Sequence, residues 1–363
     1  MRTRNRMWVA AIACAVLLGG CAMETKEQAR QRLQAGGGKT GEAAAPASTT
    51  AGAAQNGAGK LTAVQFYVPS EKENSLSVID VPTGQVVGKV QLQEAPSTVV
   101  FSSTMREAYA ANMNSSTVSI INTQTLKVEK EVAVGPMPHG MALSADNKTL
   151  YVAAVADQFV YIVDTKEGNE AGTIDLGTGA KTNYLVLFGD RLYVSDHEND
   201  KVYVVDVKTK RTVLTIPTGK TPRAIRVSDD GKKLYVPTAG EGALETYDTA
   251  DGKPLGRISV TPGATDVVVS EDGTTAVVTS MEGSAVTFVD LQAGKPVETV
   301  TDLPGARHIE YNRQQTKAYV TLSGSNEVVS IDTSTKRVVD RIQVGATPHG
   351  IRIKALPGIG GSC

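Results

Sequence analysis

Apolar residues occur in short runs of about five along the chain, separated by polar turn clusters. Residues 139–176 are the clearest example, where β-forming runs at 149–153, 159–163 and 170–174 are joined by polar breaks. The break at Ser144–Lys148 has the composition of a hairpin turn. No window shows sustained helical periodicity, and every run is short enough to be a strand. The pattern predicts an all-β fold.

The same pattern recurs every 42 residues without a slip. One set of equivalent positions comprises Asp80, Asn122, Asp164, Asp206, Asp248, Asp290 and Asp332. A second comprises Tyr67, Tyr109, Tyr151, Tyr193, Tyr235, Val277 and Tyr319, and a third Pro96, Pro138, Ala180, Pro222, Ala264, Ala306 and Pro348. Four antiparallel strands per unit of this length are typical of a propeller blade. Seven units therefore predict a seven-bladed β-propeller over residues 61–355.

Two of the repeated positions have structural explanations. An Asx side chain at a strand end accepts hydrogen bonds from amides two or three residues on, which closes a turn. Four residues after it, glycine dominates, because such loops need one residue with a positive φ. The tyrosines lie in the middle of a strand in each unit, so we expect them in the core.

The two ends of the repeat region predict how the ring closes. The first unit starts at its second strand, near Leu61, while the last unit is followed by a spare strand at His349–Ile353. Pairing this C-terminal strand with the three N-terminal strands would complete a blade and remove two exposed sheet edges. No cysteine lies within residues 61–355, so we expect no disulfide in the propeller.

Individual units also carry a family resemblance. The segments Gly135-x-x-Pro138-His139-Gly140, Leu150-Tyr151-Val152 and Val163-Asp164-Thr165 resemble the bacterial YVTN-type repeat, as in YncE-like proteins. The resemblance covers about residues 61–355 and implies the fold. It does not imply one function, because propellers serve many roles.

The N-terminus has the pattern of a bacterial lipoprotein signal. Three arginines precede the apolar stretch Met7–Leu18, which ends in Leu17-Leu18-Gly19-Gly20-Cys21. We therefore expect a signal peptide at 1–20, acylation of Cys21, and a propeller anchored to the cell envelope and facing the periplasm. Ala22 favours the outer over the inner membrane. An ordinary signal peptide or a short anchor is the alternative.

The segment after this signal has a linker composition. Between residues 35 and 59, 16 of 25 residues are Ala or Gly, too few large apolar groups to stabilise a fold. We expect a lipid anchor and flexible linker at 21–60, with a short helix possible near 24–34, and a C-terminal tail at 356–363.

Candidate binding residues gather at one predicted mouth of the channel. The residue after each position of the proline set reads Ser97, His139, Lys181, Arg223, Thr265, Arg307 and His349. The whole chain has a formal net charge of −1, or −4 without the three signal arginines, so a basic ring here is a local feature. His308 and His197 lie beside it, and nearby acids partly offset its charge. We expect a non-enzymatic binding or scaffold protein whose ligand at this face is an envelope protein or a small anion.

Several alternatives stay open. Gly305-Ala306-Arg307-His308-Ile309 is similar to a Gly-Pro-Arg-His motif of lactonase-type propellers, which implies Arg307 and His308 in lactone hydrolysis if an acidic side chain reaches His308. Metal or haem handling is a further alternative, although no tight metal-ligand spacing is present, and neither a metal nor a cofactor is expected.

Single-stranded nucleic-acid binding is disfavoured. Such proteins present exposed aromatic platforms, and the single Trp of this chain, Trp8, lies in the signal. We expect a monomer.

Overall fold

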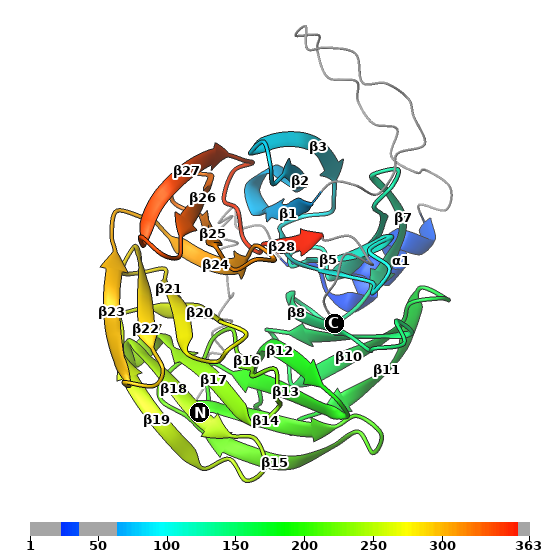
Figure 1. The fold of residues 1–363 in the computed structure, drawn as a ribbon. Helices are drawn as coiled ribbons and strands as arrows, with labels where there is room; N and C mark the ends of the chain where they lie inside the picture. Colours follow the sequence, from blue (N-terminus) through cyan, green and yellow to red (C-terminus); the bar gives the residue numbers. More distant parts are fainter. Residues whose placement is uncertain (1–22, 36–63, 355–363) are drawn as a thin grey trace, which may run out of the picture.

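Seven four-stranded antiparallel sheets surround a central axis (Figure 1). The computed structural model describes residues 23–35 and 64–354. The innermost strands, one from each sheet, are β28, β4, β8, β12, β16, β20 and β24. The predicted all-β, seven-bladed propeller is confirmed.

Within six blades the strands pair in chain order from the axis outward, whereas in the closing blade the last strand of the chain, β28, is innermost. The blade that joins the two ends of the propeller consists of β28 (Arg352–Lys354), β1 (Gln65–Ser70), β2 (Ser75–Asp80) and β3 (Gln85–Gln91). The next consists of β4 (Pro96–Phe101), β5 (Glu107–Asn112), β6 (Thr117–Asn122) and β7 (Lys127–Ala133). The third consists of β8 (Pro138–Leu143), β9 (Thr149–Ala154), β10 (Phe159–Asp164) and β11 (Asn169–Asp175).

The remaining four blades follow the same plan. They comprise β12 (Thr182–Phe188), β13 (Arg191–Asp196), β14 (Lys201–Asp206) and β15 (Arg211–Pro217); then β16 (Arg226–Val227), β17 (Lys233–Thr238), β18 (Ala243–Asp248) and β19 (Pro254–Ser259). The last two comprise β20 (Ala264–Val269), β21 (Thr275–Ser280), β22 (Ala285–Asp290) and β23 (Lys295–Val300); then β24 (Ala306–Tyr311), β25 (Lys317–Leu322), β26 (Glu327–Asp332) and β27 (Arg337–Gln343). Single 3-10 turns, η1 (Glu71–Glu73) and η2 (Ala239–Glu241), follow β1 and β17.

The ring closes as the sequence predicts, although the closing strand is shorter. β28 pairs with β1 at Tyr67↔Arg352, Phe66↔Ile353 and Gln65↔Lys354. Residues 349–351, expected in this strand, lie outside the ladder, and an isolated bridge joins Ser70 to Pro348. The closing segment therefore contacts β1 at two separate places.

The repeated Asp and Asn residues close turns, as predicted. In every unit the side-chain oxygen accepts a hydrogen bond from a backbone amide two or three residues on, for example Thr83 N to Asp80 Oδ2 at 3.1 Å. The residue four positions after it has a positive φ in all seven units, including Leu126, Lys210 and Lys336. Three blades thus accept the strain of a non-glycine residue in the left-handed region.

The repeated tyrosines are buried, again as predicted. All seven side chains of this set are at most 7% exposed. Their neighbours come from the same blade and the adjoining one: Tyr109, for example, lies in a cluster with Val100 of its own blade and Met141 and Val152 of the next. The core is therefore a set of seven layers between blades, and each blade depends on both neighbours.

Helix α1 (Lys26–Ala35) packs against the outside of the ring, beside β7 and β11 (Figure 1). Ala29 is fully buried, Lys26 Nζ lies 2.5 Å from Glu170 Oε2, and Arg30 Nη2 lies 2.8 Å from the same oxygen. The backbone amide of Glu24 donates to the carbonyl of Asn114 at 3.0 Å. The described part of the predicted 21–60 linker is thus docked on the propeller, because tertiary contacts stabilise a helix too short to persist alone.

Among the described residues, no helix has the length and apolar character needed to cross a bilayer. Cys21 and the Ala/Gly-rich segment lie outside the described residues.

Candidate functional site

The first residues of the innermost strands surround one end of the channel. At this end lie His139, the second residue of β8, and His349, which precedes β28; both belong to Pro-His-Gly segments. A Cβ on Gly140 would lie 2.6 Å from the Cα of Tyr184, and one on Gly350 would lie 2.8 Å from the carbonyl oxygen of Ser97. Glycine is needed at both places because the backbone of the next blade passes there. The recurring motif thus brings two imidazoles close to the axis.

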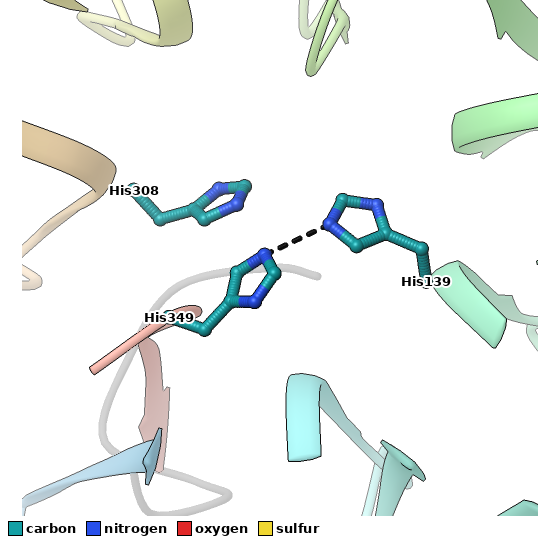
Figure 2. A group of neighbouring side chains, drawn as sticks. All are labelled: His139, His308 and His349. Atoms are coloured by element: carbon teal, nitrogen blue, oxygen red, sulfur yellow. Dashed lines mark hydrogen bonds between the residues drawn. The ribbon is translucent and has the colours of Figure 1, made fainter. Parts of the chain in front are cut away.

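Three histidines from different blades converge at this end (Figure 2). His139 is on β8, His308 is on β24, and His349 precedes β28. Nε2 of His139 lies 2.8 Å from Nε2 of His349, and one ring nitrogen from each of the three lies within 4.8 Å of the others. All three residues are at most 8% exposed. Ser97, in the blade between His139 and His349, is small and fully buried, which leaves room for the rings to meet.

The other ring nitrogen of each histidine faces an oxygen acceptor. Nδ1 of His139 lies 3.0 Å from the carbonyl of Asn183, and Nδ1 of His308 lies 2.8 Å from Oδ2 of Asp266. Nδ1 of His349 lies 2.5 Å from Oε1 of Glu71, although not in hydrogen-bonding alignment. Acceptors at Nδ1 favour the tautomer in which Nδ1 carries the proton and Nε2 presents its lone pair.

This arrangement leaves a conflict between His139 and His349. Nδ1 of His139 faces only the Asn183 carbonyl and needs a proton, so its Nε2 presents a lone pair. If His349 donates from Nε2 to that lone pair, its Nδ1 lacks a proton against the Glu71 carboxylate; if its Nδ1 carries the proton, two lone pairs lie 2.8 Å apart. One imidazolium would resolve the conflict by donating from Nε2. A metal cation between the rings would resolve it equally well.

The surroundings oppose the imidazolium. Burial, together with the nearby His308 and Arg307, lowers the pKa of His139 to about 3. Burial and the charge of Arg307 also hold the pKa of His349 well below its usual value. Burial of Asp266 would raise its pKa, but the hydrogen bond and charge of His308 outweigh that effect and lower it. The Asp266 carboxylate therefore stays ionised beside His308.

The three cations of the predicted basic ring are half-buried and partly neutralised. Nη1 of Arg307 lies 2.8 Å from Oε1 of Glu71, the same oxygen that faces His349. The Lys181 ammonium donates to the carbonyl of Ala156 at 3.1 Å. Burial lowers the pKa of Arg223, against the opposing charge of Glu282. His139 and His349, two of the five positions expected to be cationic, are buried and neutral. The ring therefore carries less positive charge than the sequence predicts.

His197 does not join the other three histidines. Its Nε2 lies 4.0 Å from Oε1 of Glu198, and its Nδ1 is buried without a partner among the described residues. Burial and then Arg223 lower its pKa. Of the four predicted histidines, the fold therefore brings together His139, His308 and His349.

Sequence reasoning missed the oxygen acceptors Asp266, Glu71 and Asn183. Asp266 had a signal, because it precedes His308 by 42 residues and so occupies the same position of the neighbouring blade. Glu71 lies in η1 and Asn183 on β12, and the repeat pattern does not relate either to a histidine.

Little free space adjoins His308 on the inner side. The cavity there measures about 10 Å³ and is lined in part by Asp266, Tyr184, Arg226 and Arg352, which is room for about one water molecule. A larger cavity of about 320 Å³ lies further along the channel.

The comparisons with known proteins agree with this architecture. Residues 189–356 match the family model of YNCE-like beta-propellers, and the seven-bladed ring extends the same unit over residues 64–354. The chain contains a YncE-like β-propeller. The resemblance expected from its repeats is therefore confirmed. No curated protein matches the sequence.

Three solved structures with different descriptions are similar to this propeller. A functionally unknown protein from Desulfotomaculum acetoxidans is 16% identical with a TM-score of 0.70, covering 80% of this chain and 98% of its own. The periplasmic gluconolactonase of Pseudomonas aeruginosa is 18% identical with a TM-score of 0.69, covering 82% and 100%. Hydrazine synthase of Kuenenia stuttgartiensis is 21% identical with a TM-score of 0.62, covering 70% and 88%. At these identities the likeness concerns the fold alone.

Proposed function

We propose that this propeller is a binding protein of the cell envelope that holds a divalent transition-metal ion between His139, His308 and His349. The observation that carries the proposal is the convergence of three buried imidazoles whose outer nitrogens face oxygen acceptors. Metal-bound histidines commonly donate their second N–H to a carboxylate or a backbone carbonyl, which orients the ring. The ligand at the mouth thus changes from the anion expected from sequence to a cation.

The dimensions support this proposal. Two nitrogens that each lie 2.0–2.1 Å from a tetrahedral zinc ion are about 3.3 Å apart. His139 and His349 are closer than this, at 2.8 Å, so a bound ion would separate them by about half an ångström. Imidazole ligands suit zinc, copper or nickel, and a fourth position would remain for water or an anion.

Charges near the site do not exclude a cation. Arg307 is the nearest guanidinium, and Glu71 neutralises it directly. Asp266 supplies a second carboxylate behind His308. Together the two carboxylates offset the arginine and one of the two charges of the ion.

The test is metal analysis of the full-length protein after chelator treatment and reloading with Zn²⁺. We expect one zinc ion per chain, and a Co²⁺-loaded sample with the visible absorption of a low-coordinate site. His139→Gln and His349→Gln should each weaken zinc binding at least tenfold, whereas His197→Gln, on the same face but outside the cluster, should not. Asp266→Asn should weaken it about 10–100-fold by removing a supporting hydrogen bond. The proposal would be refuted if the His139→Gln and His349→Gln variants still bound one zinc ion per chain. It would also be refuted if the unmodified protein bound none.

A lactone hydrolase is the second candidate, because the acidic partner required for His308 is present. Asp266 Oδ2 lies 2.8 Å from His308 Nδ1, an arrangement that suits a general base. Two features rank it lower: His308 is only 5% exposed and the space beside it is about 10 Å³. Arg307 is also already paired with Glu71. Hydrolysis of glucono-δ-lactone above background, abolished by His308→Gln, would favour this candidate.

The envelope location rests on the lipoprotein pattern ending at Cys21. With such an anchor the metal site would face the periplasm. The outer membrane is favoured over the inner as the membrane that holds the anchor. An unidentified envelope protein as a partner at the same face stays a proposal, as does a monomeric state.

A further inference from the structure

A larger cavity, which the proposed metal site does not use, adjoins the small space beside His308 and shares Tyr184, Arg226 and Arg352 with it. It measures about 320 Å³, at the lower limit for small-molecule sites. Its walls come mainly from the middle and last residues of β4, β8 and β12, together with Arg226 and Arg352, whereas the histidines lie near or before the starts of their strands. Its apolar lining includes Phe101, Met105, Met141, Leu143, Leu187 and Ile353.

Two arginines make this cavity amphipathic. Arg352 is paired, with Nη1 2.6 Å from Oε2 of Glu310. Although burial opposes it, the charge of Glu310 raises the pKa of Arg352, so Arg352 stays charged. Arg226 donates from Nε to the carbonyl of Val267 at 3.3 Å, and no carboxylate of the described residues lies within ion-pair distance of it. The cavity thus combines apolar walls with one guanidinium that makes no direct ion pair among the described residues, although the buried Asp266 carboxylate in the adjoining small cavity lies near enough to interact with its charge.

We infer that this cavity is a second binding site, for a monocarboxylate with an apolar chain of about eight to ten carbons. An Arg guanidinium binds a carboxylate through two parallel hydrogen bonds, and does so more strongly away from bulk water. The apolar walls require a tail that inorganic phosphate or acetate lacks. Two methionines in the lining, Met105 and Met141, can adjust to the shape of a flexible chain.

The chemistry predicts a graded series of affinities. Each methylene buried against the walls should improve binding about fourfold. Decanoate should therefore bind about 15-fold more tightly than octanoate. Acetate and phosphate, which lack the tail, and 1-decanol, which lacks the charge, should each bind at least tenfold more weakly than decanoate.

Titration calorimetry with decanoate tests the inference on the full chain reconstituted in lipid nanodiscs. The Leu143→Trp variant, which places a larger ring in the cavity wall and leaves both arginines in the sequence, serves as the reference, so that partitioning into lipid cancels. We expect one decanoate per chain, at least tenfold weaker binding by Arg226→Gln, and unchanged binding by Arg211→Gln on the outer strand β15. Circular dichroism melts confirm that each variant is folded.

Three outcomes would overturn the inference: no binding above the Leu143→Trp reference, equal losses for Arg226→Gln and Arg211→Gln, or binding of acetate as tight as that of decanoate. The result is independent of the metal proposal. Leu143→Trp should leave zinc binding unchanged, and His349→Gln should leave decanoate binding unchanged.

Discussion

Closure of the ring by the C-terminal segment should control the stability of the whole propeller. Deletion of residues 348–363 removes the β28–β1 ladder and the bridge between Ser70 and Pro348. It also removes the hydrogen bonds from His349 N to the Pro69 carbonyl at 2.9 Å and from Gly350 N to the Ser97 carbonyl at 2.8 Å.

The size of this loss follows from the contacts. Each hydrogen bond contributes about 1 kcal/mol net, and burial of Ile351, which is 6% exposed in a core cluster, contributes about 1.5–3 kcal/mol. The two hydrogen bonds and the burial of Ile351 thus contribute about 3.5–5 kcal/mol, and the β28–β1 ladder adds to this. Because a domain is stable by only about 5–15 kcal/mol, the truncated chain should be unfolded or marginal.

Thermal melts followed by circular dichroism check this expectation. The single change Ile351→Ala should lower the free energy of unfolding by about 2–5 kcal/mol; a loss of about 3 kcal/mol corresponds to a Tm about 6–12 °C lower. Deletion of 356–363 alone, which spares β28, is the matched control and should leave Tm unchanged. A chain ending at residue 347 that melts within about 2 °C of the full protein would show that closure does not hold the ring.

Two further predictions concern a half-buried acid and the anchor. Burial raises the pKa of Glu131 to about 7, and its Oε2 has no partner among the described residues. Because its folded pKa lies above the ordinary 4.5, this group favours the folded state more as pH falls from about 8 to 4.5, by about 3 kcal/mol. Glu131→Gln should therefore be more stable than the unmodified protein at pH 8 in urea titrations, with the advantage lost near pH 5; parallel pH profiles would contradict this. Cys21→Ser should abolish labelling by a radioactive or clickable fatty acid and release the protein from membranes, and unchanged membrane fractionation would rule out the lipoprotein assignment.

The sequence by itself determined the blade and the ring. A strict 42-residue repeat specifies identical local contacts seven times, so the turn at Asp80 and the core position of Tyr67 could be assigned without any long-range information. Ring closure could also be predicted from the sequence. The first unit lacks a strand and the last has a spare one, so pairing the two covers both exposed sheet edges.

Only the tertiary structure decided the chemistry of the channel. His139 and His349 are 210 residues apart, and whether their rings meet depends on ring diameter, side-chain direction and the small Ser97 between them. The same holds for Glu71, which neutralises Arg307 and faces His349 from a different loop. Burial then converts two positions that read as cationic into neutral imidazoles. A repeat determines which residues share a position, whereas packing across the axis decides which of them touch.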